Sequence, residues 1–242
     1  GTDPREAVAF HGSSSATGVI SVDGVAPKEN DAVSVSFGEE GEQRTYSYTV
    51  KKDDTVRNIR DGLIELINAA EDEQVVASPG GVFTRIFLQS KKTGSEGEGL
   101  RYTAKGTDSV FMTAYGERLC CSSEAGAPIT ADNPARPGEL ITIYATGLGL
   151  VLPEEAKFST ITGSKYLGPE FNYTNTPVDD AIAGGKTANV IFAGLKRDAV
   201  GVYEVKLLLN SDLPTNAQTE LIIAQQIYVS NIVTFPVVNP NE

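Results

Sequence analysis

The sequence is short of the residues on which most catalytic and metal sites depend. It has one histidine, two cysteines, one methionine and no tryptophan among 242 residues. A Ser-His-Asp triad would have to use His11, and one histidine cannot form the usual zinc sites with several histidines. His11 lies in a Gly/Ser-rich segment near the amino terminus, where an exposed, uncoordinated side chain is expected. The composition therefore predicts a protein that is not an enzyme, with no cofactor and no metal.

Basic residues and long apolar runs are also scarce. The chain has 20 Lys and Arg side chains and 32 Asp and Glu side chains, which gives a formal net charge of −12. This charge repels phosphate backbones and anionic headgroups, so nucleic acid is not an expected partner. The apolar runs have the length of strands, well short of the roughly 20 residues that cross a membrane. No transmembrane segment is expected.

Cys120 and Cys121 are adjacent, so they do not form the disulfide framework that is typical of small secreted domains. Neighbouring Cα atoms lie closer than a relaxed disulfide requires. Two thiols at the end of a strand, a vicinal disulfide and an intermolecular link are the alternatives that the sequence leaves open.

The chain length predicts two modules of about 100 to 120 residues each. Composition and turn residues place a flexible tail at residues 1–14, a first module at 15–122, a linker at 123–128 and a second module at 129–238. Both modules alternate apolar and polar residues at the period of strands. The expected fold is therefore mainly β with two domains.

One segment of the first module has the period of a helix instead. Apolar residues recur every three or four positions between residues 55 and 70, which draws one apolar stripe along a helix. Asp53 and Asp54 precede it and are expected to cap its first turn. The first module is thus an α+β module, in which one amphipathic helix covers a β-sheet.

Several short segments of the first module carry a resemblance to a known repeat. They are Asp31, Val33, Val35, Tyr46 to Val50, Asp54-Thr55, Leu66-Ile67-Asn68 and Lys92 to Gly97. On these residues the module resembles a repeat of phage tail-sheath-like and adhesin-like proteins. The matching positions are turns, caps and core residues, so the resemblance implies an architecture and says little about activity.

The second module consists of strand-length segments separated by turns, with one long strand expected from Thr219 to Val229. Gly184-Gly185-Lys186-Thr187 ends like a phosphate-binding loop, but position 180 holds Asp180 where that motif needs glycine. A hairpin turn is expected there. Tyr203 follows Gly201 at the start of a strand, which is typical of a tyrosine corner, although a plain inward-facing residue fits equally.

Five segments of the second module, in order along the chain, carry a second resemblance. They are Asn133 to Gly138, Thr142 to Gly149, Phe192 to Leu195, Val200 to Val205 and Ser230 to Thr234. On these residues the module resembles the Solibacter-type C-terminal domain of exported acidobacterial proteins. This resemblance implies an immunoglobulin-like β-sandwich and an extracellular or cell-surface location; no signal peptide is visible in the sequence.

The segment from Pro153 to Asn175 departs from that family because it is unusually aromatic. We expect it to be a partner-binding loop that recognises an unknown protein or a glycan. The candidate residues are Phe158, Tyr166, Phe171 and Tyr173.

Other motifs have plainer interpretations. Adjacent carboxylates in an extended chain, such as Asp179 and Asp180, point in opposite directions and are expected to be solvated charge. Calcium bound by these residues or by Asp132 is a weaker alternative. Asn172-Tyr173-Thr174 matches the N-glycosylation pattern, which arises easily by chance.

The sequence therefore predicts a non-catalytic binding or adhesion module, or an accessory segment of a larger secreted protein. The alternative is a structural unit of a surface appendage or a tail-like particle, in which exposed strand edges mediate assembly.

Overall fold

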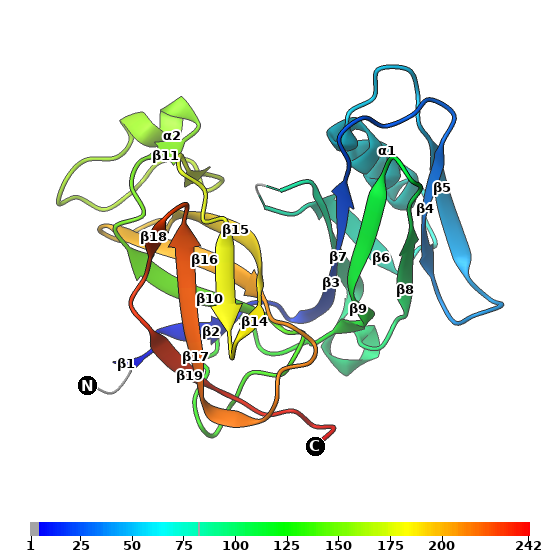
Figure 1. The fold of residues 1–242 in the computed structure, drawn as a ribbon. Helices are drawn as coiled ribbons and strands as arrows, with labels where there is room; N and C mark the ends of the chain where they lie inside the picture. Colours follow the sequence, from blue (N-terminus) through cyan, green and yellow to red (C-terminus); the bar gives the residue numbers. More distant parts are fainter. Residues whose placement is uncertain (1–4, 82) are drawn as a thin grey trace. The chain divides into compact units, whose positions relative to one another are not determined.

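A computed structural model describes residues 5–81 and 83–242 of the chain, and its fold is mainly β, as expected (Figure 1). The described chain forms two compact units. One consists of residues 13–123 and is called the inserted unit. The other consists of residues 5–12 together with residues 124–242 and is called the host unit, because its sequence continues on both sides of the inserted one.

The inserted unit contains two sheets and one α-helix. Its four-stranded sheet has the order β6-β7-β3-β9, and its three-stranded sheet has the order β5-β4-β8. The elements are β3 Ser15–Asp23, β4 Ala32–Phe37, β5 Arg44–Thr49, α1 Val56–Asn68, β6 Val75–Pro79, β7 Arg85–Thr93, the 3₁₀ helix η1 Gly94–Gly97, β8 Tyr102–Lys105 and β9 Phe111–Cys120.

Helix α1 confirms the predicted amphipathic helix, and Ile59, Leu63 and Ile67 bury its apolar face. The cap differs from the prediction. The hydroxyl of Thr55 accepts the backbone N–H of Asn58, and the Asn58 side chain accepts the backbone N–H of Thr55, which makes a capping box.

Asp53 and Asp54 therefore do not cap the helix. The Asp54 carboxylate instead accepts bonds from the Tyr48 hydroxyl at 2.9 Å and the Lys51 backbone N–H at 2.8 Å. It stabilises the turn that precedes the helix, which is why an acidic residue is found there.

Tyr102 is the largest fully buried side chain of the inserted unit, and its hydroxyl donates to the carbonyl oxygen of Tyr115. Its ring packs against the backbone of β3 at Gly18. A Cβ at Gly18 would lie 2.8 Å from both the Tyr102 ring and the side chain of Leu119. Glycine is therefore required at position 18 for close packing.

Replacing Gly18 by alanine is expected to lower the free energy of unfolding by about 1–3 kcal/mol, because the added methyl overpacks this contact. Urea denaturation would measure the change. Ser47→Ala on the exposed face of β5 is the control and should change stability by less than about 0.5 kcal/mol. Equal stability of Gly18→Ala and the wild type would contradict the packing account.

The host unit contains two larger sheets. One has the order β1-β19-β17-β13-β14, with β18 also paired to β17, and the other has the order β15-β16-β10-β2. The elements are β1 Arg5–Glu6, β2 Ala9–His11, β10 Leu140–Thr146, β11 Val151–Leu152, α2 Glu154–Phe158, β12 Tyr173–Thr174, β13 Asp180–Ala183, β14 Lys186–Thr187, β15 Asn189–Leu195, β16 Val202–Leu208, β17 Asn216–Gln225, β18 Tyr228–Val229 and β19 Val233–Val237.

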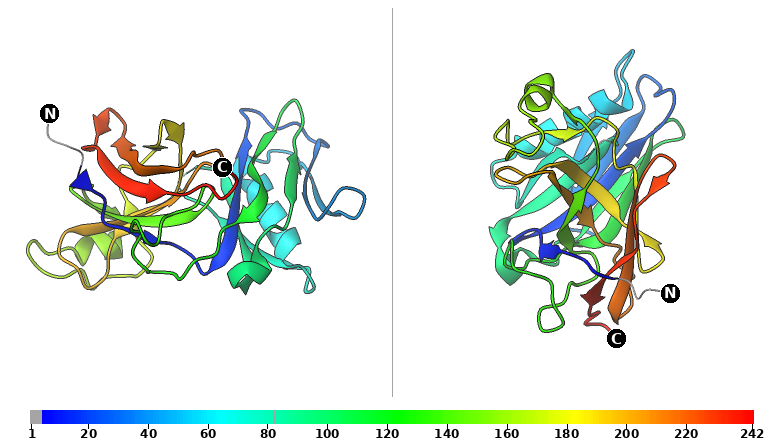
Figure 2. Two further views of the ribbon diagram at one scale, coloured as in Figure 1. Left: turned by 90° about the horizontal axis from the view of Figure 1, so that it is seen from below. Right: turned by 90° about the vertical axis from the view of Figure 1, so that its left-hand side faces the viewer.

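The two sheets of the host unit form two layers (Figure 2), and residues of both belong to one apolar core. Ile141 and Leu207 project into it from one sheet, and Leu221 and Phe235 project into it from the other. The predicted hairpin is also confirmed, since Ala183 pairs with Lys186 across two glycines of positive φ.

The prediction of a flexible tail over residues 1–14 is wrong for residues 5–14, and its first four residues lie outside the described residues. β1 and β2 lie within residues 5–11 and pair with β19 and β10 respectively, and Ser15 already begins β3. The predicted linker at 123–128 is corrected as well. The backbone N–H of His11 donates to the carbonyl oxygen of Ala127 at 3.0 Å, and the carbonyl oxygen of His11 accepts the backbone N–H of Gly126 at 2.8 Å. Gly126 and Ala127 therefore belong to the host unit.

His11 was expected to be exposed, but it is buried beside β10. Its Nδ1 atom lies 2.5 Å from Oε1 of Glu139, which is also buried, and its Nε2 atom lies 3.3 Å from the carbonyl oxygen of Asn133. The second carboxylate oxygen accepts the Arg136 backbone N–H at 2.9 Å. The hydrogen bond to Glu139 raises the pKa of His11 above its ordinary value of 6.5, against opposing effects of burial and of the Arg136 charge.

This pair predicts a pH dependence of stability. Because the folded-state pKa of His11 is raised, its contribution is complete below pH 6.5 and is lost as the pH rises through the folded-state pKa. Urea denaturation from pH 6 to pH 9 should show this loss in the wild type and not in His11→Gln. Since His11 is the only histidine, parallel pH profiles of the two proteins would contradict this role.

Candidate partner-binding surface

The predicted partner-binding loop is an insertion of the host unit between β10 and β13. Its ends are held together by a small sheet, in which Val151 pairs with Thr174 and Leu152 with Tyr173. The Asn175 N–H also donates to the carbonyl oxygen of Leu150 at 2.8 Å. Helix α2 lies inside the insertion, which therefore has secondary structure of its own.

Tyr166 anchors the insertion to the loop between β15 and β16. Its backbone N–H donates to the carbonyl oxygen of Ala199, and its carbonyl oxygen accepts the backbone N–H of Asp198, both at 2.9 Å. Its ring is almost fully buried, and its hydroxyl donates to the carbonyl oxygen of Pro169 at 2.9 Å. Burial raises the pKa of the Tyr166 hydroxyl.

Asn172 is a second anchor, and the sequence did not single it out for this role. Its side chain is fully buried, accepts the Leu195 N–H at 2.6 Å and donates to the Leu195 carbonyl oxygen at 3.1 Å. A Cβ at Gly194 would come within 2.4 Å of the Asn172 carbonyl oxygen, so glycine lets the insertion lie directly on β15. The N-glycosylation pattern at Asn172 thus falls on an amide engaged inside the fold.

The predicted binding residues divide into two groups. Phe158 and Phe171 are 75 % and 74 % exposed, and Tyr173 is also exposed. The prediction that Tyr166 contacts a partner is wrong, because its ring is buried and its hydroxyl is bonded within the loop. The structure adds exposed apolar side chains that the sequence reasoning missed, namely Leu150, Ile161 and Leu167.

A second apolar loop lies at the same end of the host unit (Figure 1). The expected strand over Thr219 to Val229 turns back at Gln226, whose φ is positive, to form β18. The side chain of Gln225 donates to the carbonyl oxygens of Leu148 and Thr176, at 3.2 Å and 2.7 Å. These bonds tie the hairpin to both ends of the insertion.

We call the exposed apolar residues of three segments the loop-end surface. The segments are the insertion with its flanking residues, the loop between β15 and β16, and the hairpin of β17 and β18. These segments are hydrogen-bonded to one another and to the strands beneath them. The residues are Leu150, Phe158, Ile161, Leu167, Phe171, Tyr173, Val200, Ile227, Tyr228 and Val229.

Tyr203 supports the loop end from below. Its ring is buried in the core, and its hydroxyl donates to the carbonyl oxygen of Gly149, just before the insertion. Burial raises the pKa of this hydroxyl. The Tyr203 hydroxyl thus donates to a backbone carbonyl 54 positions earlier in the chain. In a tyrosine corner the hydroxyl bonds to the backbone only a few residues upstream.

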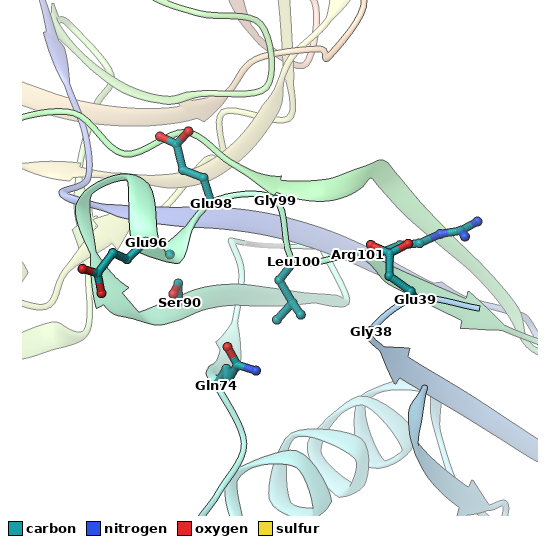
Figure 3. A pocket seen from close by; sticks show the side chains of 10 residues that line it. Gly38, Glu39, Gln74, Ser90, Glu96, Glu98, Gly99, Leu100 and Arg101 are labelled. Atoms are coloured by element: carbon teal, nitrogen blue, oxygen red, sulfur yellow. The ribbon is translucent and has the colours of Figure 1, made fainter. Parts of the chain in front are cut away.

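The inserted unit has a polar pocket of about 260 Å³ (Figure 3). Its carboxylates do not converge, since Glu96 and Glu98 point in different directions in Figure 3. Glu98 accepts two bonds from Ser122 at 2.7 Å. Glu39 is paired with Arg118, which lowers the pKa of the Glu39 carboxyl. The pocket therefore does not bring together the two carboxylates that acid–base catalysis or cation binding would use.

Asp179 and the two cysteines, which were also candidates for chemistry, are bonded within the fold. Among the described residues, no group of three or more His, Cys, Asp or Glu is placed to hold a metal ion. Asp179 accepts the Gln226 backbone N–H at 3.0 Å. The structure joins Cys120 and Cys121 as a vicinal disulfide, which is one of the alternatives that the sequence left open.

No family model matches the chain, and no curated protein matches it. Within the described part of the chain, no helix combines the length and the apolar content that crossing a membrane requires. The loop-end surface thus has to be interpreted from its own geometry.

Replacing Asn172 by alanine should lower the free energy of unfolding by about 1–3 kcal/mol, because it leaves the Leu195 N–H and carbonyl oxygen without their partner. Asn175→Ala, on the exposed side of the same loop, is the matched control and should change stability little. Thermal denaturation of both variants would measure the difference. A fully stable Asn172→Ala variant would show that the insertion is not anchored there.

Proposed function

We propose that the chain is a non-catalytic binding or adhesion module of an exported or cell-surface protein, and that its host unit is an immunoglobulin-like sandwich. The strand order of the two sheets supports the second part. An immunoglobulin fold has strands A-B-E-D in one sheet and C-F-G, extended by C′, in the other. The orders β2-β10-β16-β15 and β14-β13-β17-β19 follow the same pattern along the chain.

In this assignment the insertion is the B–C loop, and the hairpin of β17 and β18 lies in the F–G loop. Those two loops lie at one end of the immunoglobulin fold, where variable domains bind antigen. The hydrogen bonds of Gln225 to both ends of the insertion agree with that placement. The loop end is therefore the proposed site of recognition.

The observation that carries the proposal is the exposure of Phe158 and Phe171 on an anchored loop. Exposed apolar side chains lower the solubility of a protein, so a group of them indicates an interaction site. Aromatic side chains lose little conformational entropy on binding and supply much of the binding free energy of protein interfaces. The partner is a protein or a glycan. Nucleic acid is disfavoured by the net charge of −12.

The test is a binding screen of the immobilised chain against a glycan array and a panel of purified extracellular proteins. A ligand of the wild type should bind at least about tenfold more weakly to Phe158→Ser combined with Phe171→Ser, because two anchors are lost. Val25→Ser combined with Val76→Ser removes exposed valines of the inserted unit and serves as control. A ligand whose affinity is equal for all three proteins, or no ligand at all, would overturn the proposal.

An assembly role is the second candidate, favoured by the exposed apolar residues Tyr228 and Val229 on a short strand at a sheet edge. Size-exclusion chromatography with light scattering distinguishes the two. Concentration-dependent oligomers that Val229→Asp abolishes would support assembly, whereas a monomer at all concentrations would support the binding module.

A further inference from the structure

The host unit has a groove of about 640 Å³ that opens between its two sheets. It is lined by the crossing from β1 to β2, the end of β10 and the hairpin of β17 and β18. The lining is largely apolar, with Ile143, Leu221, Ile223 and Val233 among its residues. The volume is in the range of sites that enclose a ligand or several side chains.

One wall of the groove is a strand edge of β10. This strand pairs with β16 from Leu140 to Thr146, but its register with β2 covers only residues 141 to 143. The Tyr144 N–H then donates to the carbonyl oxygen of Val8 at 3.0 Å. Because alternate residues of a strand direct their backbone groups to the same side, the backbone of Thr146 faces this edge too.

The hairpin supplies a second strand edge. In the part of the chain that the structure describes, β18 pairs with β17 alone. Tyr228 and Val229 line the groove and are 73 % and 61 % exposed. Val8, on the crossing between β1 and β2, also lines it and is exposed. Apolar side chains thus border a groove that has a strand edge on two sides.

We infer that this groove binds an extended peptide segment of a partner protein by strand addition, with alternate apolar side chains of the peptide inserted between the two sheets. Backbone bonds to β10 or β18 would give affinity, and the apolar lining would select the inserted side chains. The site adds to the proposed binding module and uses none of the side chains of the insertion.

The strand edges favour a peptide over an acyl chain. An acyl chain could fill the apolar volume but would leave the backbone N–H and carbonyl groups of both edges without partners. Small side chains, Ala7, Ala145 and Ala224, line the groove and leave room for inserted residues. The net charge of −12 favours a peptide with basic flanks over a second copy of this chain.

The probe is a fluorescein-labelled peptide of nine alternating valines and threonines with lysines at both ends, titrated with the full chain and followed by fluorescence anisotropy. Two control peptides accompany it. In the first, aspartate replaces every valine. The second keeps all side chains but carries N-methyl groups on alternate backbone nitrogens, which removes strand pairing.

The matched variants are Ala145→Phe, which fills the groove, and Ala217→Phe, which adds the same side chain at an exposed position of β17. The valine peptide should bind the wild type and Ala217→Phe equally, and Ala145→Phe at least about tenfold more weakly. Neither control peptide should bind.

Three outcomes would overturn the inference. The valine peptide could fail to bind, Ala145→Phe could leave its affinity unchanged, or the N-methylated peptide could bind equally well. Displacement of the N-methylated peptide by dodecanoate would identify an acyl-chain site instead. A peptide affinity that is unchanged in Phe158→Ser combined with Phe171→Ser separates this result from the loop-end proposal.

Discussion

The pairing of β2 with its two neighbours is the constraint on which the rest of the structure depends. β2 precedes the inserted unit, whereas β10 and residues 126–129 follow it. Backbone bonds from His11 and Ala9 to residues 126–129 bring the two ends of the inserted unit together, and Ser123 donates to Ser13 at 3.0 Å just beyond them. The host unit completes its sheet only with a strand that lies more than 120 residues from its partner. The buried bond between His11 and Glu139 locks that strand in place.

Local periodicity predicted much of the fold. The apolar stripe of α1, the alternation in β4 and β5 and the glycine pair of the β13–β14 hairpin are short-range signals, and each is found where expected. The contribution of residues 5–11 to the host unit was not predictable in this way. Three-residue strands carry little periodicity, and the partner of His11 is 128 positions away.

The sequence predicted only some of the exposed residues of the candidate surface, again because exposure depends on contacts between residues far apart in the chain. Aromatic composition indicated the insertion, but composition does not distinguish Phe158, which is exposed, from Tyr166, which is buried. That difference depends on loop contacts with residues 198 and 199, more than 30 positions away. The β18 hairpin was missed because Gln226 adopts a positive φ without glycine or asparagine, so no turn residue marked it.

The meeting of Ser13 and Ser123 has a consequence for how such a chain can change. A domain whose ends lie close together can be gained, lost or exchanged at that junction while the host sheet keeps its strands, since only a short connection between β2 and residue 124 has to be rebuilt. Residues 13–123 supply no strand to the two sheets of the host unit, so a change of this segment would leave the strand order of those sheets intact.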